Sequence, residues 1–349
     1  MAEAPILRVD ALTKRFGDRV ALNDVSFSVN AGEYVSLLGP SGAGKTVLLR
    51  AIAGFEQPEE GRVYLDGRDA SDTPAHLRGI GFVFQNFALF PHLTVFDNVA
   101  FGLRNGARKT SEKEARERTQ DMLDLVGLRG LEGRGVHQIS GGQRQRVALA
   151  RTLVTSPRLV LLDEPLGALD ANLRLRMRGE LRRIRERLGI PFLHVTGSES
   201  EALAMGDRLI VLDAGHIGQF GPPGDVYENP ASPNVARFLN CYNLFDGALE
   251  GDAFVTSYGR FPYARRVSSA KAAYAVRYDR LTAEIEGGGL PGEYIATEYM
   301  GSSVVHFFSA PDGKVLEVER HLSNGPPGEF QPGRSYRLSW RREDAIAYG

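Results

Sequence analysis

The segment from Gly39 to Thr46 restricts the fold of this 349-residue chain more than any other part of its sequence. It matches the pattern G-x-x-x-x-G-K-[ST], in which glycines let backbone N–H groups approach the β- and γ-phosphates of a nucleotide. Lys45 adds a positive charge between the terminal phosphates, and Thr46 offers a hydroxyl to Mg²⁺. The predicted phosphate-binding residues are Gly39, Pro40, Ser41, Gly42, Ala43, Gly44, Lys45 and Thr46.

The sequence on both sides of this loop predicts a strand, a turn and a helix. Residues 34–38 have the pattern of a buried strand, and residues 47–53 form a helical pattern that ends at Gly54. The N-terminus of this helix would point at the phosphates, where its dipole favours negative charge. The context therefore predicts a nucleoside triphosphate site in an α/β fold.

Composition limits the classes of protein to which this chain could belong. A chain of 349 residues suggests two domains, and 42% hydrophobic with 24% charged residues is ordinary for a soluble globular protein. The net charge of −1 gives no reason to expect nucleic acid as a partner. The single cysteine, Cys241, excludes an internal disulfide and favours a reducing compartment. No apolar run approaches the roughly 18 residues that span a bilayer, so we expect any membrane role to depend on a partner.

A second motif supplies two carboxylates. The apolar run of residues 158–165 contains Asp163 and Glu164 near its end, and in an open α/β sheet ligands bind at this carboxyl edge of a central strand. We expect Asp163 to hold Mg²⁺ through water and Glu164 to act as the general base on the attacking water. Gln85, where a predicted strand enters a loop, is expected to reach Mg²⁺ or this water, with a plain surface role as the alternative.

A third motif, Ser140-Gly141-Gly142-Gln143, precedes a helical stretch over residues 144–154. Serine and glycines at a helix N-terminus form an anion-binding cradle. One chain would then have two cradles but only one phosphate-loop lysine. This arrangement is explained if the second cradle closes over the nucleotide of another copy.

Together these motifs resemble the ABC ATPase family, over residues 7 to about 235, and the Ser-Gly-Gly-Gln element is specific to that family. The resemblance implies ATP and Mg²⁺ as cofactors, a head-to-tail homodimer with composite sites, and Asp170 as the acid that links the two sites. Phe16 would stack on adenine, although packing near the first strand is the alternative. Ser140 to Gln143 would contact the γ-phosphate bound to the opposing protomer.

One position departs from the family pattern. The strand after the Asp-Glu pair usually ends in Thr-His-Asp, whose histidine contacts the γ-phosphate, and here Gly197 takes its place. His194 lies about 10 Å earlier along the strand and on its opposite face, so we expect it in the core. Loss of one donor to a transition-state oxyanion costs about 2.7–4 kcal/mol. We therefore expect normal ATP binding with slow or conditional hydrolysis.

Three explanations of this departure remain open. The chain is a weakened ATPase, or a water or Ser198 replaces the histidine, or the chain is a degenerate copy. The presence of Glu164 argues against a degenerate copy, because a site that no longer hydrolyses ATP would not need a general base.

A helical subdomain is predicted over about residues 86–157. Its first part, Phe87–Phe96, is unusually apolar for a loop. The resemblance implies that this segment receives a coupling helix of a transmembrane permease subunit, and packing within the subdomain is the alternative. The arginine-rich run of residues 174–187 has an apolar face at helical spacing, which indicates a solvated amphipathic helix and no nucleic-acid surface.

After residue 235, short alternating runs such as 274–278, 304–308 and 315–319 predict a small β-barrel or sandwich. Its position resembles the C-terminal OB-like accessory domain of importer ATPases. The expected fold class is therefore an α/β P-loop ABC ATPase domain, residues 1–235, followed by a small OB-like β-barrel, residues 236–349, with an accessory or regulatory role.

The resemblance implies an ATP-hydrolysing subunit, peripheral on the cytoplasmic face of the inner membrane, that energises an importer fed by a solute-binding protein. Residues 55–58 and 96–103 look most like the polyamine, opine and phosphonate group, followed by iron and sugar importers. A soluble ABC ATPase acting on nucleic acid or ribosomes is the alternative, but that class usually has two cassettes or a coiled-coil insertion. A regulatory ATP-binding subunit with little turnover is a variant of the importer interpretation.

Overall fold

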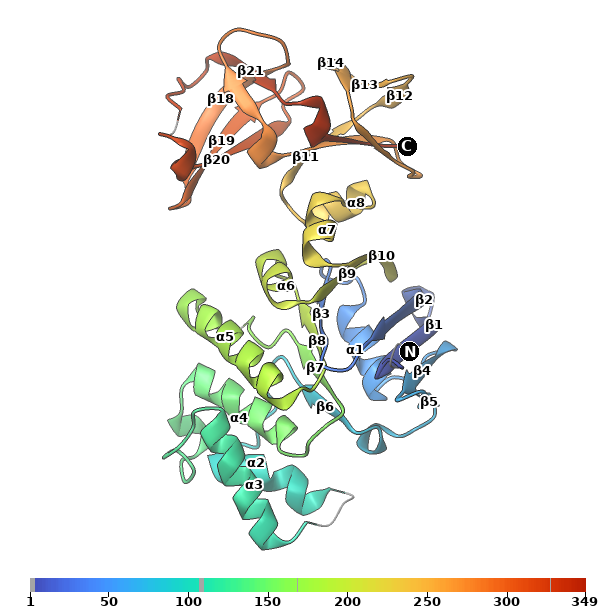
Figure 1. The fold of residues 1–349 in the computed structure, drawn as a ribbon, viewed down its shortest axis with the longest axis vertical. Coiled ribbons are helices and arrows are strands. Elements are labelled where there is room, and N and C mark those ends of the chain that lie inside the picture. The colour runs from blue at the N-terminus through green and yellow to red at the C-terminus, as the bar shows by residue number, and fades with distance from the viewer. Residues whose placement is uncertain (1–3, 107–109, 168, 327) are drawn as a thin grey trace. The chain divides into compact units, whose positions relative to one another are not determined.

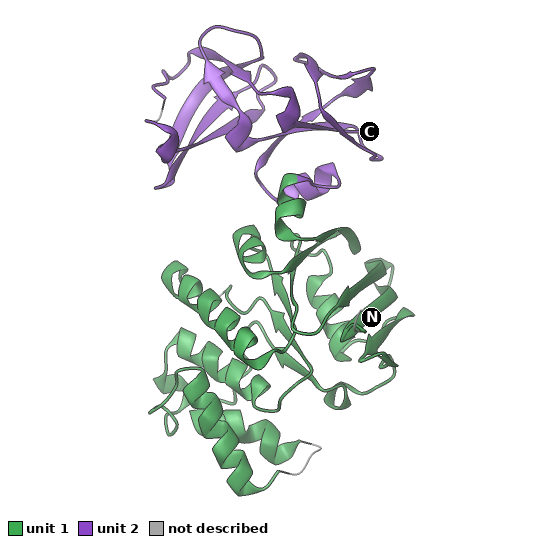
Figure 2. Ribbon diagram, in the orientation of Figure 1, with its two compact units in different colours: residues 1–228 green, residues 229–349 purple. Residues whose placement is uncertain are grey.

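The computed structural model describes residues 4–106, 110–167, 169–326 and 328–349. The chain divides into two compact units, with the boundary between Glu228 and Asn229 (Figures 1 and 2). Helix α8, Pro233–Phe238, spans the domain boundary predicted at residue 235 and belongs to the second unit. No helix of the described residues has both the length and the apolar character needed to cross a membrane.

A six-stranded sheet in the order β10-β9-β3-β8-β7-β6 forms the centre of the first unit. All its strands are parallel except β10, which runs antiparallel to β9 at the edge. Leu159 and Leu161 of β7 pack into one hydrophobic cluster and Val160 and Leu162 into another. Burial on both faces explains why this strand is continuously apolar. The strands are β3 (Tyr34–Leu38), β6 (Ile80–Val83), β7 (Leu159–Asp163), β8 (Phe192–Thr196), β9 (Arg208–Asp213) and β10 (His216–Gly221).

One face of this sheet shares its hydrophobic cluster with helix α1 and a second, antiparallel sheet in the order β2-β1-β4-β5. Helix α1, Lys45–Ala53, buries Leu48 and Ile52 completely and ends at Gly54 in the left-handed conformation, as the sequence predicts. The strands of the second sheet are β1 (Leu7–Phe16), β2 (Arg19–Val29), β4 (Glu60–Leu65) and β5 (Arg68–Asp69).

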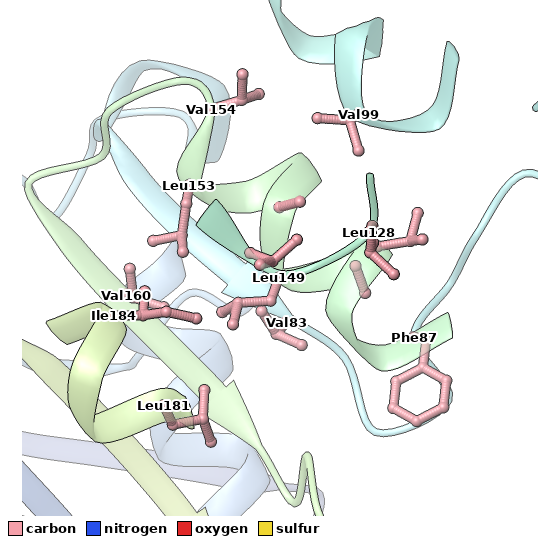
Figure 3. Close-up of a cluster of buried hydrophobic side chains, with 14 of the residues drawn as sticks. Val83, Phe87, Val99, Leu128, Leu149, Leu153, Val154, Val160, Leu181 and Ile184 are labelled. Atoms are coloured by element: carbon pink, nitrogen blue, oxygen red, sulfur yellow. The ribbon is translucent and has the colours of Figure 1, made fainter. Parts of the chain in front are cut away.

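The other face is covered by helices that share a second hydrophobic cluster (Figure 3). Val83 of β6, Leu149 of α4 and Ile184 of α5 belong to this cluster, which joins the helical region to the sheet. The arginine-rich run forms α5, whose buried residues Met177, Leu181 and Ile184 make up its apolar face. The helices of this unit are α2 (Val95–Asn105), α3 (Glu112–Leu125), α4 (Gly141–Leu153), α5 (Ala171–Leu188), α6 (Glu199–Met205) and α7 (Pro223–Glu228).

The second unit is rich in β-strands, as predicted from its alternating runs. A four-stranded sheet has the order β11-β16-β22-β15, a three-stranded sheet β12-β13-β14, and a five-stranded sheet β17-β21-β18-β19-β20. Its core is aromatic and includes Phe245, Tyr274 and Phe308. The strands are β11 (Tyr242–Asp246), β12 (Ala248–Glu250), β13 (Ala253–Thr256), β14 (Gly259–Pro262), β15 (Arg265–Val267), β16 (Ala273–Arg277), β17 (Thr282–Glu284), β18 (Leu290–Tyr299), β19 (Ser303–Ser309), β20 (Val315–His321), β21 (Ser335–Ser339) and β22 (Ala345–Tyr348).

The buried side chain of Asn98 holds the loop before α2 in place. Its Oδ1 accepts from the Phe90 N–H at 2.9 Å, and its Nδ2 donates to the carbonyls of Phe90 at 3.1 Å and Thr94 at 3.0 Å. We expect Asn98→Leu to lower the free energy of unfolding by about 1–3 kcal/mol, because backbone groups of Phe90 lose their partners. Urea unfolding of the full chain measures this loss.

The control is Asn105→Leu, on the same helix. Asn105 is exposed and donates only one hydrogen bond of this kind, to the Phe101 carbonyl at 3.0 Å. We expect its free energy of unfolding to change by less than about 0.5 kcal/mol. Equal losses in the two variants would contradict the assigned role of Asn98.

Candidate nucleotide site

The phosphate loop connects β3 to α1, and two of its glycines are required by close packing. A Cβ on Gly39 would lie 2.3 Å from the Leu212 carbonyl oxygen, and a Cβ on Gly44 would lie 2.4 Å from the Ala21 carbonyl oxygen. Gly44 also has a φ of 102°, which side-chain-bearing residues rarely adopt. It is the N-cap of α1, so it leaves the first backbone N–H groups of that helix without a side-chain cap.

Lys45 lies over this loop. Its Nζ donates to the carbonyl oxygens of Gly39 at 2.8 Å and Pro40 at 2.9 Å. Burial lowers the pKa of Lys45, and the carboxylates of Glu164 and Asp163 oppose that shift. The ammonium group is therefore held within the loop, and the two nearby carboxylates favour its charged form.

The hydroxyl of Thr46 donates to Oδ1 of Asp163 at 3.1 Å, which joins α1 to the end of β7. Burial raises the pKa of Asp163, and the hydrogen bond from Thr46 partly offsets this. A hydroxyl and a carboxylate are hard oxygen ligands, which suit Mg²⁺ when phosphates and waters complete its coordination. The described residues contain no cluster of three or more His, Cys, Asp or Glu that could hold a metal by themselves.

Glu164 follows β7 and is bonded to the Gln85 side chain. Nε2 of Gln85 donates to Oε2 of Glu164 at 2.9 Å. Glu164 has a φ of 46°, and its N–H donates to the Val195 carbonyl at 3.0 Å. This left-handed conformation is costly for a residue with a side chain and is typical of functional positions. The structure thus brings together Gln85, Lys45, Thr46, Asp163 and Glu164.

Ser140 begins α4 with a reciprocal pair of hydrogen bonds. Its hydroxyl accepts from the Gln143 N–H at 3.3 Å, and Oε1 of Gln143 accepts from the Ser140 N–H at 2.8 Å. Asp170 caps α5 by accepting from the Leu173 N–H at 2.9 Å. The Leu173 side chain would lie 2.8 Å from a Cβ on Gly142, so Asp170 and the Ser140 segment form a second group.

One aromatic residue, Phe16, and one basic residue, Arg19, lie at the edge of the phosphate loop region. Phe16, the last residue of β1, is 47% exposed, with the Lys14 ammonium 5.1 Å from its ring centroid. Its exposure favours a contact with a ligand over packing in the core. Arg19 donates to the Gly42 carbonyl at 3.4 Å. Sequence reasoning missed Arg19, because it is a lone basic residue on β2 and only the fold brings it to the loop.

Gly197 follows β8 in a turn held by Thr196. The Thr196 hydroxyl accepts from the Ser198 N–H at 3.0 Å and donates to Oε2 of Glu201 at 2.5 Å. His194 is completely buried, and its Nδ1 lies 3.0 Å from the Tyr34 hydroxyl. Burial lowers the pKa of His194 to about 3, so it is neutral.

Comparison with known proteins matches the ABC transporter family over residues 22–167 and the TOBE domain over residues 274–347. The spermidine/putrescine import ATP-binding protein PotA of Rubrobacter xylanophilus is 41% identical over 355 residues, covering 98% of this chain and 93% of that protein. The Fe(3+) ions import ATP-binding protein FbpC of Brucella abortus is 42% identical over 324 residues, covering 90% and 91%. The chain belongs to the ABC transporter ATP-binding subunits.

A solved structure of the ATP-binding cassette MJ0796, a dimer in a post-hydrolysis state bound to ADP and Pi, is similar to this subunit. It has 33% sequence identity and a TM-score of 0.56, and the match covers 62% of this chain and 98% of that one. The predicted family and the predicted α/β fold with a β-rich C-terminal domain are confirmed. This ABC subunit is an ATP-hydrolysing enzyme that energises an importer.

The raised pKa of Asp163 gives a prediction with a definite sign. The folded subunit binds this proton more tightly than the unfolded chain, so stability falls as pH rises from the ordinary pKa of 3.8 through the folded pKa. At pH 7 the ionised carboxylate is destabilising without nucleotide, and we expect Asp163→Asn to raise the thermal midpoint. Calorimetry measures this gain, which should vanish well below pH 3.8.

The same variant should lose most of the stabilisation that ATP with Mg²⁺ gives, because it lacks the carboxylate that would hold the metal. Asp121→Asn, at an exposed position of α3, is the control and should change neither the midpoint nor its response to ATP. A lower midpoint for Asp163→Asn at pH 7 would show that the carboxylate stabilises the fold.

Proposed function

We propose that two copies of this subunit close head to tail over two ATP molecules. The supporting observation is the division of the site residues into two groups within one chain, one around Lys45 and one around Ser140 and Asp170. Each group is half of a site: the first holds phosphates and Mg²⁺, and the second presents the N-terminus of α4 to the γ-phosphate. Two-fold symmetry then completes both sites at one interface.

The roles of the individual residues follow from their contacts. Lys45, Thr46 and the loop N–H groups would bind the phosphates, and Thr46 with Asp163 would hold Mg²⁺. When bound, Mg²⁺ neutralises the charge that develops on the transferred phosphoryl group. Glu164 accepts the proton of the attacking water, and the hydrogen bond from Gln85 orients its carboxylate. Gln85 would also approach the metal.

Phe16 would stack on the adenine, since its ring is exposed at the end of β1. A base–aromatic stack is worth about 1–3 kcal/mol. Phe16 would thereby contribute to ATP affinity without taking part in hydrolysis.

We also propose that hydrolysis is slow because Gly197 has no side chain to offer the γ-phosphate. The adjacent groups already have partners: the Ser198 N–H donates to Thr196, and the Ser198 hydroxyl lies 3.2 Å from the Ser200 hydroxyl. His194 is bound to Tyr34 inside the core. ATP binding and closure would remain, because they depend on the phosphate loop.

The permease would bind at Phe87–Phe96 and the apolar surface next to it. Phe87 and Val95 are buried within the subdomain, so part of this segment packs internally. Phe90 lies 4.4 Å from Phe101 between ring centroids, and Phe101 is 38% exposed. An aromatic pair at the surface suits a hydrophobic coupling helix. The subunit would then lie on the cytoplasmic face of the inner membrane and meet a solute-binding protein only indirectly.

A polyamine is the cargo that we propose, since the relative that matches 98% of this chain is a spermidine/putrescine import protein. Uptake of labelled spermidine and putrescine by the subunit with its permease in lipid tests this. Uptake of Fe³⁺ in place of both polyamines would support the iron class instead. Co-purification with nucleic acid or ribosomes, and with no membrane protein, would contradict the importer role.

The Gly197→His variant tests the proposed cause of slow hydrolysis. A Cβ at Gly197 meets no atom within 4 Å, so a side chain fits. We expect turnover of ATP by the complex with its permease in lipid to rise about 100–1000-fold, the usual value of one preplaced donor. Phosphate release measures this rise, and adding Glu164→Gln to the variant should abolish it.

Gly224→His is the matched control, because Gly224 in α7 also has open space where its Cβ would be. It should leave turnover unchanged. Native turnover already at about 1–100 per second, with no gain in Gly197→His, would mean that another group supplies the γ-phosphate contact.

A further inference from the structure

The two residues that follow Gln85 and Asn86 have an unusual backbone. Phe87 has a φ of 64° and Ala88 a φ of 46°, although neither is glycine. Two consecutive side-chain-bearing residues in the left-handed region are strained, and such a turn persists only where its surroundings hold it. The strain begins two residues after Gln85, the glutamine that contacts Glu164.

Arg151 of α4 holds this turn. Its guanidinium donates to the Phe87 carbonyl at 2.8 Å and to the Ala88 carbonyl at 2.7 Å, and lies 5.5 Å from the centroid of the Phe90 ring. Arg151 takes no part in the salt bridges found among the described residues. Its charge is thus directed at the two carbonyls of the strained turn, and the fork of a guanidinium suits two acceptors at once.

The same helix also contacts strand β6, which precedes Gln85 in the sequence. The Thr152 hydroxyl, next to Arg151 in the sequence, donates to the Ala148 carbonyl of its own helix at 3.0 Å and lies 3.3 Å from the Phe82 carbonyl of β6. The Phe87 ring is buried in the cluster that contains Leu149 of α4 (Figure 3). The strand before Gln85 and the turn after it therefore both contact the C-terminal part of α4.

We propose that Arg151 is a positioning residue, which fixes the strained turn and thereby places the Gln85 side chain against Glu164. Ser140, the N-cap of helix α4, lies eleven residues or about 16 Å before Arg151. A rigid helix of this length links the position of the Ser140 segment to that of Gln85. Arg151 therefore makes the contact between Gln85 and Glu164 depend on where the Ser140 segment lies.

This inference rests on the proposed function for the roles of Gln85, Glu164 and Ser140. That Arg151 holds the turn at Phe87 and Ala88 rests on the contacts of Arg151 alone. The experiment uses the purified full chain with Arg151→Met, which keeps the bulk and removes the donors. Hydrogen exchange of the peptide covering residues 84–90 is measured beside kcat and KM for ATP. Turnover is also measured in the Gly197→His background, so that slow native hydrolysis does not hide an effect.

We expect Arg151→Met to speed exchange in residues 84–90 at least tenfold and to lower kcat about tenfold, with KM changed less than twofold. Arg151→Lys keeps the charge but lacks the planar guanidinium group. Its exchange rate in residues 84–90 and its kcat should lie between those of Arg151→Met and the native chain. Adding Ala88→Gly to Arg151→Met should restore at least a third of the native kcat, because glycine adopts a positive φ without strain. A merely structural role for Arg151 would not give this rescue.

Arg118→Met is the matched control. Arg118 also donates to a backbone carbonyl at the end of α4, that of Val154 at 2.6 Å, and among the described residues none of its hydrogen bonds reaches the turn. It should leave exchange in residues 84–90 and kcat unchanged. Unchanged exchange in Arg151→Met, or a loss of kcat that Ala88→Gly fails to restore, overturns the proposal. Absence of any turnover in the native and Gly197→His chains would contradict the roles proposed for Gln85 and Glu164, and hydrogen exchange would still decide whether Arg151 holds the turn.

Discussion

The hydrogen bond between Thr46 and Asp163 joins the two parts of the sequence on which the site depends. Thr46 lies in the first turn of α1, and Asp163 is the last residue of β7, 117 positions later. The parallel sheet makes this contact possible, since β3 and β7 both pair with β8 and so end at the same edge. Lys45 and Glu164 are the neighbours of these two residues in sequence, so one contact brings a cation, a hydroxyl and two carboxylates together.

The turn at Gly197 is held by the hydrogen bonds of Thr196, although position 197 itself has no side chain. Thr196 still accepts from the Ser198 N–H and donates to Glu201, whose pKa is raised by burial. A Cβ at position 197 would meet open space, so this turn has room for a side chain. The proposed effect of Gly197 on hydrolysis therefore requires no change in the fold, and ATP binding is expected to remain when hydrolysis is slow.

Much of this arrangement could be predicted from the sequence, because its signals are local. The strand before the phosphate loop, the glycines of the loop and the end of α1 at Gly54 each depend on residues a few positions apart. The fold around β7 followed from an uninterrupted apolar run. Arg19 and Arg151 could not be found in this way. Each is one arginine among many, and its partners are carbonyl oxygens that any residue type could supply.

The strained residues could not be predicted either, for a related reason. Glu164, Phe87 and Ala88 all have a positive φ without being glycine, and no local pattern favours that conformation. Each is held by tertiary contacts: Glu164 by the Val195 carbonyl, and the turn at Phe87 and Ala88 by Arg151. Strain of this kind requires a surrounding structure that over-determines the backbone. Its location on both sides of the hydrogen bond between Gln85 and Glu164 indicates that this contact is formed by the fold as a whole.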